Sequence, residues 1–129
     1  PKDWFKEEKD LSDKFGQPVS GLDLDQGLVG AGSWGGGNHF SRVFVYDLKN
    51  DQEILNREFS EIGDICTFKF IPNTDYAVIA GGRTLVSCKE GIRIINYRQD
   101  GQAKWIWKDW GDPDFIGKAV SLSPNGKEI

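Results

Sequence analysis

Methionine is absent from this 129-residue chain, histidine occurs once and cysteine twice. With one histidine and no CxxC pair, the sequence lacks the spacing of a zinc site or a dithiol redox motif. No apolar run reaches the ~18 residues of a membrane-spanning helix. Basic residues are few, 16 against 20 acidic ones, giving a net charge of −4. We therefore expect no metal, no cofactor, no membrane span and no nucleic-acid partner, because nucleic acids require a basic surface.

The two cysteines, Cys66 and Cys88, leave two arrangements open. They are either two buried thiols or one disulfide between neighbouring strands. Because disulfides persist only in oxidising compartments, the location of the protein stays open as well.

Glycine and aromatic residues, in contrast, are abundant, with 16 glycines and five tryptophans. Aromatic residues favour strands and glycines favour tight turns. Only the first 17 residues predict a helix, amphipathic over 3–15, with Asp3 as its cap. Trp4, Leu11 and Phe15 share one face of it, and Gly16 ends it.

From Val19 onward the pattern predicts short strands separated by turn residues. The predicted strands are Val19–Asp25, Gly27–Ala31, Arg42–Leu48, Glu53–Phe59, Ile65–Ile71, Tyr76–Ala80, Thr84–Cys88, Ile92–Tyr97, Ala103–Trp107 and Ala119–Ser123. Asp100–Gly101 and Asn125–Gly126 are dipeptides typical of tight hairpins. The Val43–Tyr46 segment is apolar on both alternations, which indicates a strand covered on both faces.

The sequence also repeats at an interval of about 50 residues, in the range of propeller blades. Leu28–Gly32 matches Val78–Gly82, and Arg42–Asp47 matches Gly91–Asn96. A third match joins the turns at 71–74 and 123–126. Each copy has the same order of strands and turns, so we predict an all-β chain of four-stranded antiparallel blades.

The segment 18–129 resembles the blades of WD-repeat β-propellers, with Val45–Tyr46–Asp47 at the position of the family's hydrophobic–aromatic–Asp signature. Ser123–Pro124–Asn125–Gly126 resembles the family's first turn, and Gly101–Trp105 resembles the last strand of looser propellers. The second copy has Asn96–Tyr97 at the signature, so the resemblance is to WD-like blades. It implies about two and a half blades and a non-enzymatic scaffold that binds a protein partner.

Two and a half blades are too few for a closed propeller, which needs about four. Three explanations stay open. The chain is a piece of a longer protein, several chains assemble to close the ring, or the fold is a small β-sandwich. We expect the first.

The loop after the second predicted strand contains the main candidate binding residues, Trp34, Asn38 and His39. A glycine-rich loop that presents Trp and His at a propeller rim is suited to binding a protein or a sugar. Packing of Trp34 against the sheet is the alternative. The same loop holds a G-x-G-x-x-G sequence at Gly30–Gly35, but too few residues follow for the helix that a dinucleotide site requires.

Other clusters predict structure rather than chemistry. Trp105 and Trp107 share a strand face by period two and, with Trp110, form a predicted core cluster. Asp112–Pro113–Asp114 is predicted to be a surface turn and not a calcium loop. Asp23 and Asp25 are predicted to lie on a solvated face. We expect no catalytic residue, and the alternative function is a fragment of a carbohydrate-binding or hydrolytic propeller enzyme.

Overall fold

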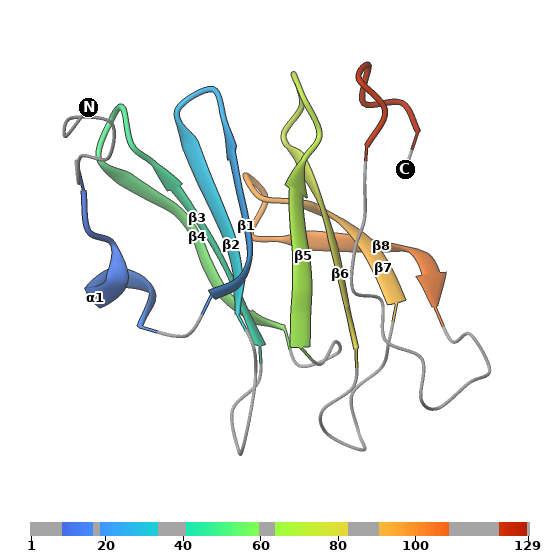
Figure 1. The fold of residues 1–129 in the computed structure, drawn as a ribbon, viewed down its shortest axis with the longest axis horizontal. Coiled ribbons are helices and arrows are strands. Elements are labelled where there is room, and N and C mark those ends of the chain that lie inside the picture. Colours follow the sequence, from blue (N-terminus) through green and yellow to red (C-terminus); the bar gives the residue numbers. More distant parts are fainter. Residues whose placement is uncertain are drawn as a thin grey trace, which may run out of the picture.

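The computed structural model describes residues 9–16, 19–33, 41–59, 64–82, 91–108 and 122–128, with side chains omitted for 103–108. In this part of the chain the fold is two antiparallel four-stranded sheets (Figure 1). The first sheet consists of β1 Val19–Asp25, β2 Leu28–Ser33, β3 Ser41–Asp47 and β4 Gln52–Phe59. The second consists of β5 Asp64–Phe70, β6 Tyr76–Gly82, β7 Gly91–Asn96 and β8 Gln102–Lys108. Both sheets follow chain order, which confirms the all-β prediction.

The predicted strands agree with the observed ones to within about two residues. The exceptions are two segments. Thr84–Cys88 lies outside the described residues, and β6 pairs directly with β7. Of the predicted strand Ala119–Ser123, only Leu122 and Ser123 are described, and neither is in a strand.

The N-terminal helix is much shorter than predicted. α1 covers only Ser12–Phe15, residues 9–11 are not helical, and Asp3 and Trp4 lie outside the described residues. The Asp10 carboxylate accepts a hydrogen bond from the Ser12 amide at 2.9 Å. This local bond competes with continuation of a helix through Asp10. Gly16 adopts φ +69° and ends α1, as predicted.

The pairing of strands shows that the two sheets repeat one plan. Asp47 pairs with Gln52 and Asn96 with Gln102, so the signature residues match at an offset of 49. The first strands carry a register shift at the same point, around Ser20 in β1 and around Cys66 in β5. The second strands match at an offset of 48, since Leu28 and Tyr76 pair with the two signature residues. The glycine match from the sequence was therefore two residues out of register. Residues that occupy the same place in the two sheets are called repeat equivalents below.

The turn between β5 and β6 recurs at residues 122–128. The Ile71 amide bonds to the Tyr76 carbonyl, and the Ser123 amide bonds to the Glu128 carbonyl, both at 2.9 Å and 52 residues apart. The two turns are neighbours, because a Cβ on Gly126 would lie 3.1 Å from Pro72. The β1–β2, β5–β6 and 122–128 turns thus lie in a row at the top of Figure 1.

The core lies between the two sheets and is built of residues from both. β5 and β6 contribute Ile65, Phe68, Phe70, Ala77 and Ile79, which pack on the strands of the first sheet. Glycines on β2 make room for them: a Cβ on Gly30 would overlap the Phe68 ring, and one on Gly32 would overlap Ile65. All of Val43–Tyr46 is buried, which confirms that β3 is covered on both faces.

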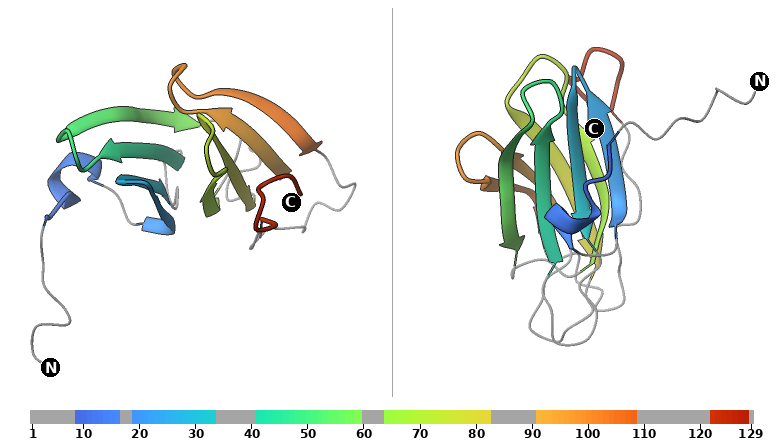
Figure 2. Two further views of the ribbon diagram at one scale, coloured as in Figure 1. Left: turned by 90° about the horizontal axis from the view of Figure 1, so that it is seen from above. Right: turned by 90° about the vertical axis from the view of Figure 1, so that its left-hand side faces the viewer.

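The first strands of the two sheets, β1 and β5, lie side by side (Figure 1). Seen from above in the left view of Figure 2, β1 and β5 lie towards one side of the molecule, and the fourth strands, β4 and β8, lie towards the opposite side. Polar side chains of β1 bond to the open edge of β5. The Asp23 carboxylate accepts the Phe70 amide at 2.9 Å, and the Ser20 hydroxyl donates to the Ile65 carbonyl. Because an open edge attracts other strands, these bonds protect β5 from mispairing.

The opposite face of the first sheet is covered only in part. Phe15 of α1 stacks on Phe44 with ring centroids 5.2 Å apart, and Leu11 packs beside it. With Ala31 and Tyr46 these residues form a second, smaller hydrophobic cluster. Within the described residues no helix is long and apolar enough to cross a membrane.

Candidate functional site

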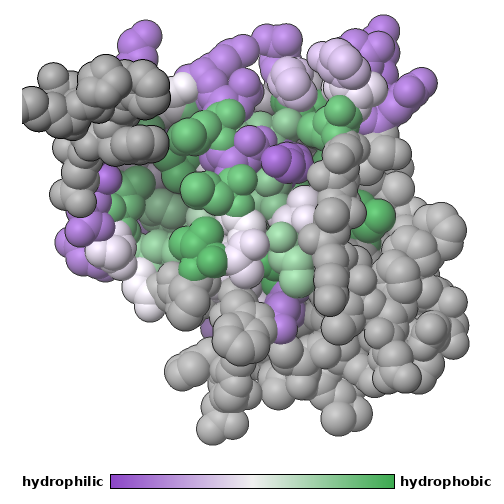
Figure 3. All heavy atoms as spheres, viewed as in Figure 1, coloured by the Kyte–Doolittle hydropathy of each residue, from purple (hydrophilic) through white to green (hydrophobic). Residues whose placement is uncertain are grey.

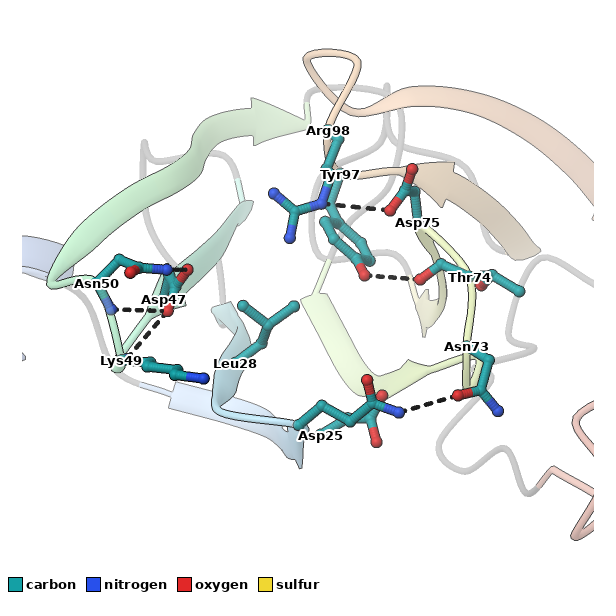
Figure 4. A pocket seen from close by; sticks show the side chains of 11 residues that line it. Asp25, Leu28, Asp47, Lys49, Asn50, Asn73, Thr74, Asp75, Tyr97 and Arg98 are labelled. Atoms are coloured by element: carbon teal, nitrogen blue, oxygen red, sulfur yellow. Dashed lines mark hydrogen bonds and ion pairs between the residues drawn. The ribbon is translucent and has the colours of Figure 1, made fainter.

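A polar cleft opens between the two sheets at the end where their hairpin turns lie (Figure 4). Its volume is about 570 Å³. Turns of both sheets contribute to its wall, and the apolar side chains of Leu28 and Tyr97 line it as well. The polar lining residues are Asp25, Gln26, Asp47, Lys49, Asn50, Asn73, Thr74, Asp75 and Arg98. A cleft of this size can hold a few side chains of a partner or one small molecule.

One side of the cleft is built by the β3–β4 turn. The Asp47 carboxylate accepts hydrogen bonds from the Lys49 and Asn50 amides at 3.0 and 3.1 Å, and from the Asn50 side chain at 2.8 Å. The bond from the Asn50 side chain is the main reason why the pKa of Asp47 is lowered. Its repeat equivalent, Asn96, accepts the Arg98 amide in the same way at 3.1 Å. The Asp or Asn that ends the third strand therefore caps the following turn in both copies.

The opposite side is held by Tyr97 and Arg98. The Tyr97 hydroxyl donates to the Thr74 carbonyl at 2.8 Å, and the Arg98 guanidinium pairs with the Asp75 carboxylate at 3.2 Å. Burial raises the pKa of Tyr97, which favours the neutral hydroxyl that donates this bond. The Gln26 amide bonds to Asn73 at 3.0 Å and joins the first hairpins of the two sheets. These bonds fix the position of the cleft wall.

The charges that line the cleft are unequal. Three carboxylates, Asp25, Asp47 and Asp75, face two cations, Lys49 and Arg98. Asp47 is engaged by its own turn and Asp75 by Arg98, while Asp25 has no ion-pair partner in the described part of the chain. The cleft therefore offers carbonyl and carboxylate acceptors, which suit a partner's ammonium, guanidinium or amide groups.

The predicted binding residues Trp34, Asn38 and His39 lie outside the described residues, as do Cys88, Trp110 and Asp112–Asp114. Gly30 and Gly32, the first two glycines of the G-x-G-x-x-G sequence, lie in β2. Because they carry no side chain, they leave room for Phe68 and Ile65 of the second sheet. β2 pairs antiparallel with β3, an arrangement without the crossover helix of a dinucleotide site.

Two further predictions from the sequence concern the pair Asp23 and Asp25 and the pair Trp105 and Trp107. Asp23 is half-buried and bonds to β5, whereas the next acid on that strand, Asp25, lines the cleft. The predicted solvated face is therefore wrong for Asp23, whose carboxylate bonds to the backbone of the second sheet. Trp105 pairs with Arg93 and Trp107 with Ile92, so a register shift interrupts the period-two alternation on which their shared face was predicted.

Among the described residues, no group of three or more His, Cys, Asp or Glu side chains is placed to hold a metal ion. The Cys66 sulfur lies 3.7 Å from the Asp64 carbonyl oxygen, in a half-buried position.

Comparison with protein-family models, with curated proteins and with solved structures found no match.

The cleft residues were not predicted from the sequence as a site. The available signal was the pair of turns after the third strands, where Asp47–Asn50 and Asn96–Gln99 match at the repeat offset. What the sequence does not contain is the packing of the two sheets, which brings these turns opposite Asn73–Asp75.

Proposed function

We propose that the two sheets are consecutive blades of a WD-like β-propeller and that the protein is a non-enzymatic scaffold that binds a protein partner. The WD-like assignment rests on the resemblance around Val45–Tyr46–Asp47. The repeated strand order, the repeated edge bulge and the third turn at 122–128 are consistent with it.

The manner in which the sheets pack favours blades over a β-sandwich. In a sandwich the inner faces of two sheets meet each other. Here the face of the second sheet that carries Phe68 and Phe70 packs on the first sheet. The equivalent face of the first sheet points the other way, towards α1, because Leu22, Ala31 and Phe44 lie in one row of that face. The sheets are therefore stacked front to back, as consecutive blades are.

The observation that carries the scaffold function is the polar cleft between the sheets. Its walls are fixed by turn caps and by the Tyr97 and Arg98 bonds, and Asp25 leaves an acceptor available for a partner. Loops held by a rigid frame are common binding elements. We propose that the partner is a protein segment with a basic residue that enters this cleft.

The test is binding of the full chain to an array of peptides that differ in whether they carry lysine or arginine. We expect basic peptides to be retained, and Asp25→Asn to weaken their binding by about tenfold, as for loss of one charged hydrogen bond. Asp13→Asn is the matched control, since this exposed carboxylate lies on α1, outside the residues that line the cleft.

Equal retention of basic and neutral peptides would contradict the proposed cleft. A parallel glycan array tests the alternative function. Saturable sugar binding that is lost in Trp34→Ala, with no peptide binding, would replace the scaffold proposal by a carbohydrate-binding one.

A further inference from the structure

Five large hydrophobic side chains are exposed in the described part of the chain, and the repeat accounts for all of them. Three lie on β1, where Val19, Leu22 and Leu24 are 51%, 57% and 64% exposed. The others are Leu48, after β3, and Tyr76, at the start of β6. Figure 3 shows hydrophobic side chains gathered on the face in view, along the centre where β1 runs.

Each of the five is the repeat equivalent of a residue that is buried between the sheets. The equivalents on β5 of the three β1 residues are Ile65, Phe68 and Phe70. Leu48 corresponds to Tyr97, and Tyr76 corresponds to Leu28. All five equivalents belong to the core between the two sheets. Val19, Leu22, Leu24 and Leu48 therefore form an unfilled copy of an interface that the structure already contains, whereas Tyr76 lies on the face of β6 where Val78 and Ala80 are buried.

The filled copy shows what fits against such a face. Phe68 and Ile65 enter spaces that only glycines at Gly30 and Gly32 leave open on the second strand of the neighbouring sheet. In the same sheet, the Asp23 carboxylate accepts a hydrogen bond from the Phe70 amide, and the Ser20 hydroxyl donates one to the Ile65 carbonyl. On β1 the groups equivalent to these two are the Leu24 amide and the Val19 carbonyl.

We infer that the exposed face of β1, formed by Val19, Leu22, Leu24 and Leu48, is a docking surface for another β-sheet of the same repeat type. That sheet carries Ser-x-x-Asp on its first strand and Gly-x-Gly on its second. The carboxylate of its Asp accepts a hydrogen bond from the Leu24 amide, and its two glycines leave room for the side chains of Leu22 and Val19. This inference rests on the repeat within the structure and is independent of the basic-peptide function proposed above.

A second copy of this chain is not the occupant. Its Gly30–Gly32 face is already filled by its own β5. The equivalent face of its second sheet offers Val78 and Ala80, both completely buried. The docking sheet also takes the place of α1, because Tyr46, beneath α1, is the repeat equivalent of Ile95, which packs against the first sheet.

The experiment supplies the missing sheet within the chain. In a tandem protein, residues 1–63 are followed by residues 18–129, so that Pro18 of the second copy stands at the position of Asp64. The added sheet then presents Gly30 and Gly32 to the second copy of β1. We expect the tandem protein to be a monomer with a higher urea midpoint than the parent chain. We also expect exchange of the second-copy Leu24 amide to slow by about tenfold or more.

The matched variant is Leu22→Ser with Leu24→Ser. In the parent chain both side chains are exposed, and the urea midpoint is expected to stay unchanged. In the second copy of the tandem protein the same pair of substitutions is expected to remove the gain in stability. Gly30→Val in the first copy alone is expected to remove it as well.

A second tandem version with Gly-Ser added at the joint between the copies controls for strain at that joint. If neither version gains stability, or if the serine pair has the same effect in parent and tandem, the inference is wrong. Loss of basic-peptide binding, in contrast, would leave these results unaffected.

Discussion

The Asp23 carboxylate accepts a hydrogen bond from the Phe70 backbone amide at 2.9 Å, and so joins the first strands of the two sheets. This bond crosses between sheets that share no backbone ladder. It is partly buried, and it ends on an amide at the open edge of β5. Together with the bond from the Ser20 hydroxyl to the Ile65 carbonyl, it satisfies backbone groups on an edge that is otherwise open to a foreign strand.

Asp23→Ala is expected to destabilise the chain by about 1.5–3 kcal/mol, because the Phe70 amide loses a charged acceptor in a partly buried place. Urea unfolding measures the loss, and hydrogen exchange of the Phe70 amide locates it. Asp23→Asn keeps an acceptor oxygen and is expected to recover most of the stability. Asp25→Ala, on the same strand, is the control and should change stability by less than about 0.5 kcal/mol. Equal effects of the two alanine substitutions would contradict the role of Asp23.

Gly30→Ala is expected to destabilise the packing of the two sheets by about 1–3 kcal/mol, because the added Cβ overlaps the Phe68 ring. The gain from replacing a strand glycine, about 0.5–1 kcal/mol, only partly offsets this cost. Thermal unfolding of Gly30→Ala, Phe68→Leu and the double variant measures the coupling. We expect the smaller side chain in Phe68→Leu to make Gly30→Ala less harmful. Strict additivity of the two changes would show that the contact does not limit packing.

The sequence predicted the strands well because each strand carries its own local pattern. Val43–Tyr46 is apolar throughout, and Asp100–Gly101 adopts positive φ at both residues, as its hairpin composition requires. Register was harder to predict. The Gly-rich ends of β2 and β6 look alike, yet the structure aligns Gly32 with Ala80, because Leu28 and Tyr76 pair with the ends of β3 and β7. The cleft depends on the packing of one sheet on the other, which no local pattern encodes.

The Asp47 turn cap predicts a dependence of stability on acid. Hydrogen bonds, first of all from the Asn50 side chain, lower the pKa of Asp47 below 3.8 in the folded protein. The stabilisation is therefore complete above the unfolded value of about 4 and is lost as the pH falls through the lower folded value. Asp47→Asn keeps an acceptor for the Lys49 and Asn50 amides but does not titrate. Between about pH 5 and pH 2, the urea midpoint of the parent is expected to fall further than that of Asp47→Asn. Parallel curves would show that the cap does not depend on charge.

Tyr97 gives the corresponding prediction in base. Burial raises its pKa above 10.0, with smaller contributions from the charges of Arg98, Asp75 and Asp25. Since the neutral hydroxyl donates to the Thr74 carbonyl, its stabilisation is complete below about pH 10 and is lost as the pH rises through the higher folded value. Tyr97→Phe is expected to cost about 0.5–1.5 kcal/mol at neutral pH by removing one hydrogen bond. It should also remove one phenolate absorbance change from an alkaline titration. If the variant were as stable as the parent at neutral pH, the Tyr97–Thr74 bond would not be what fixes this wall of the cleft.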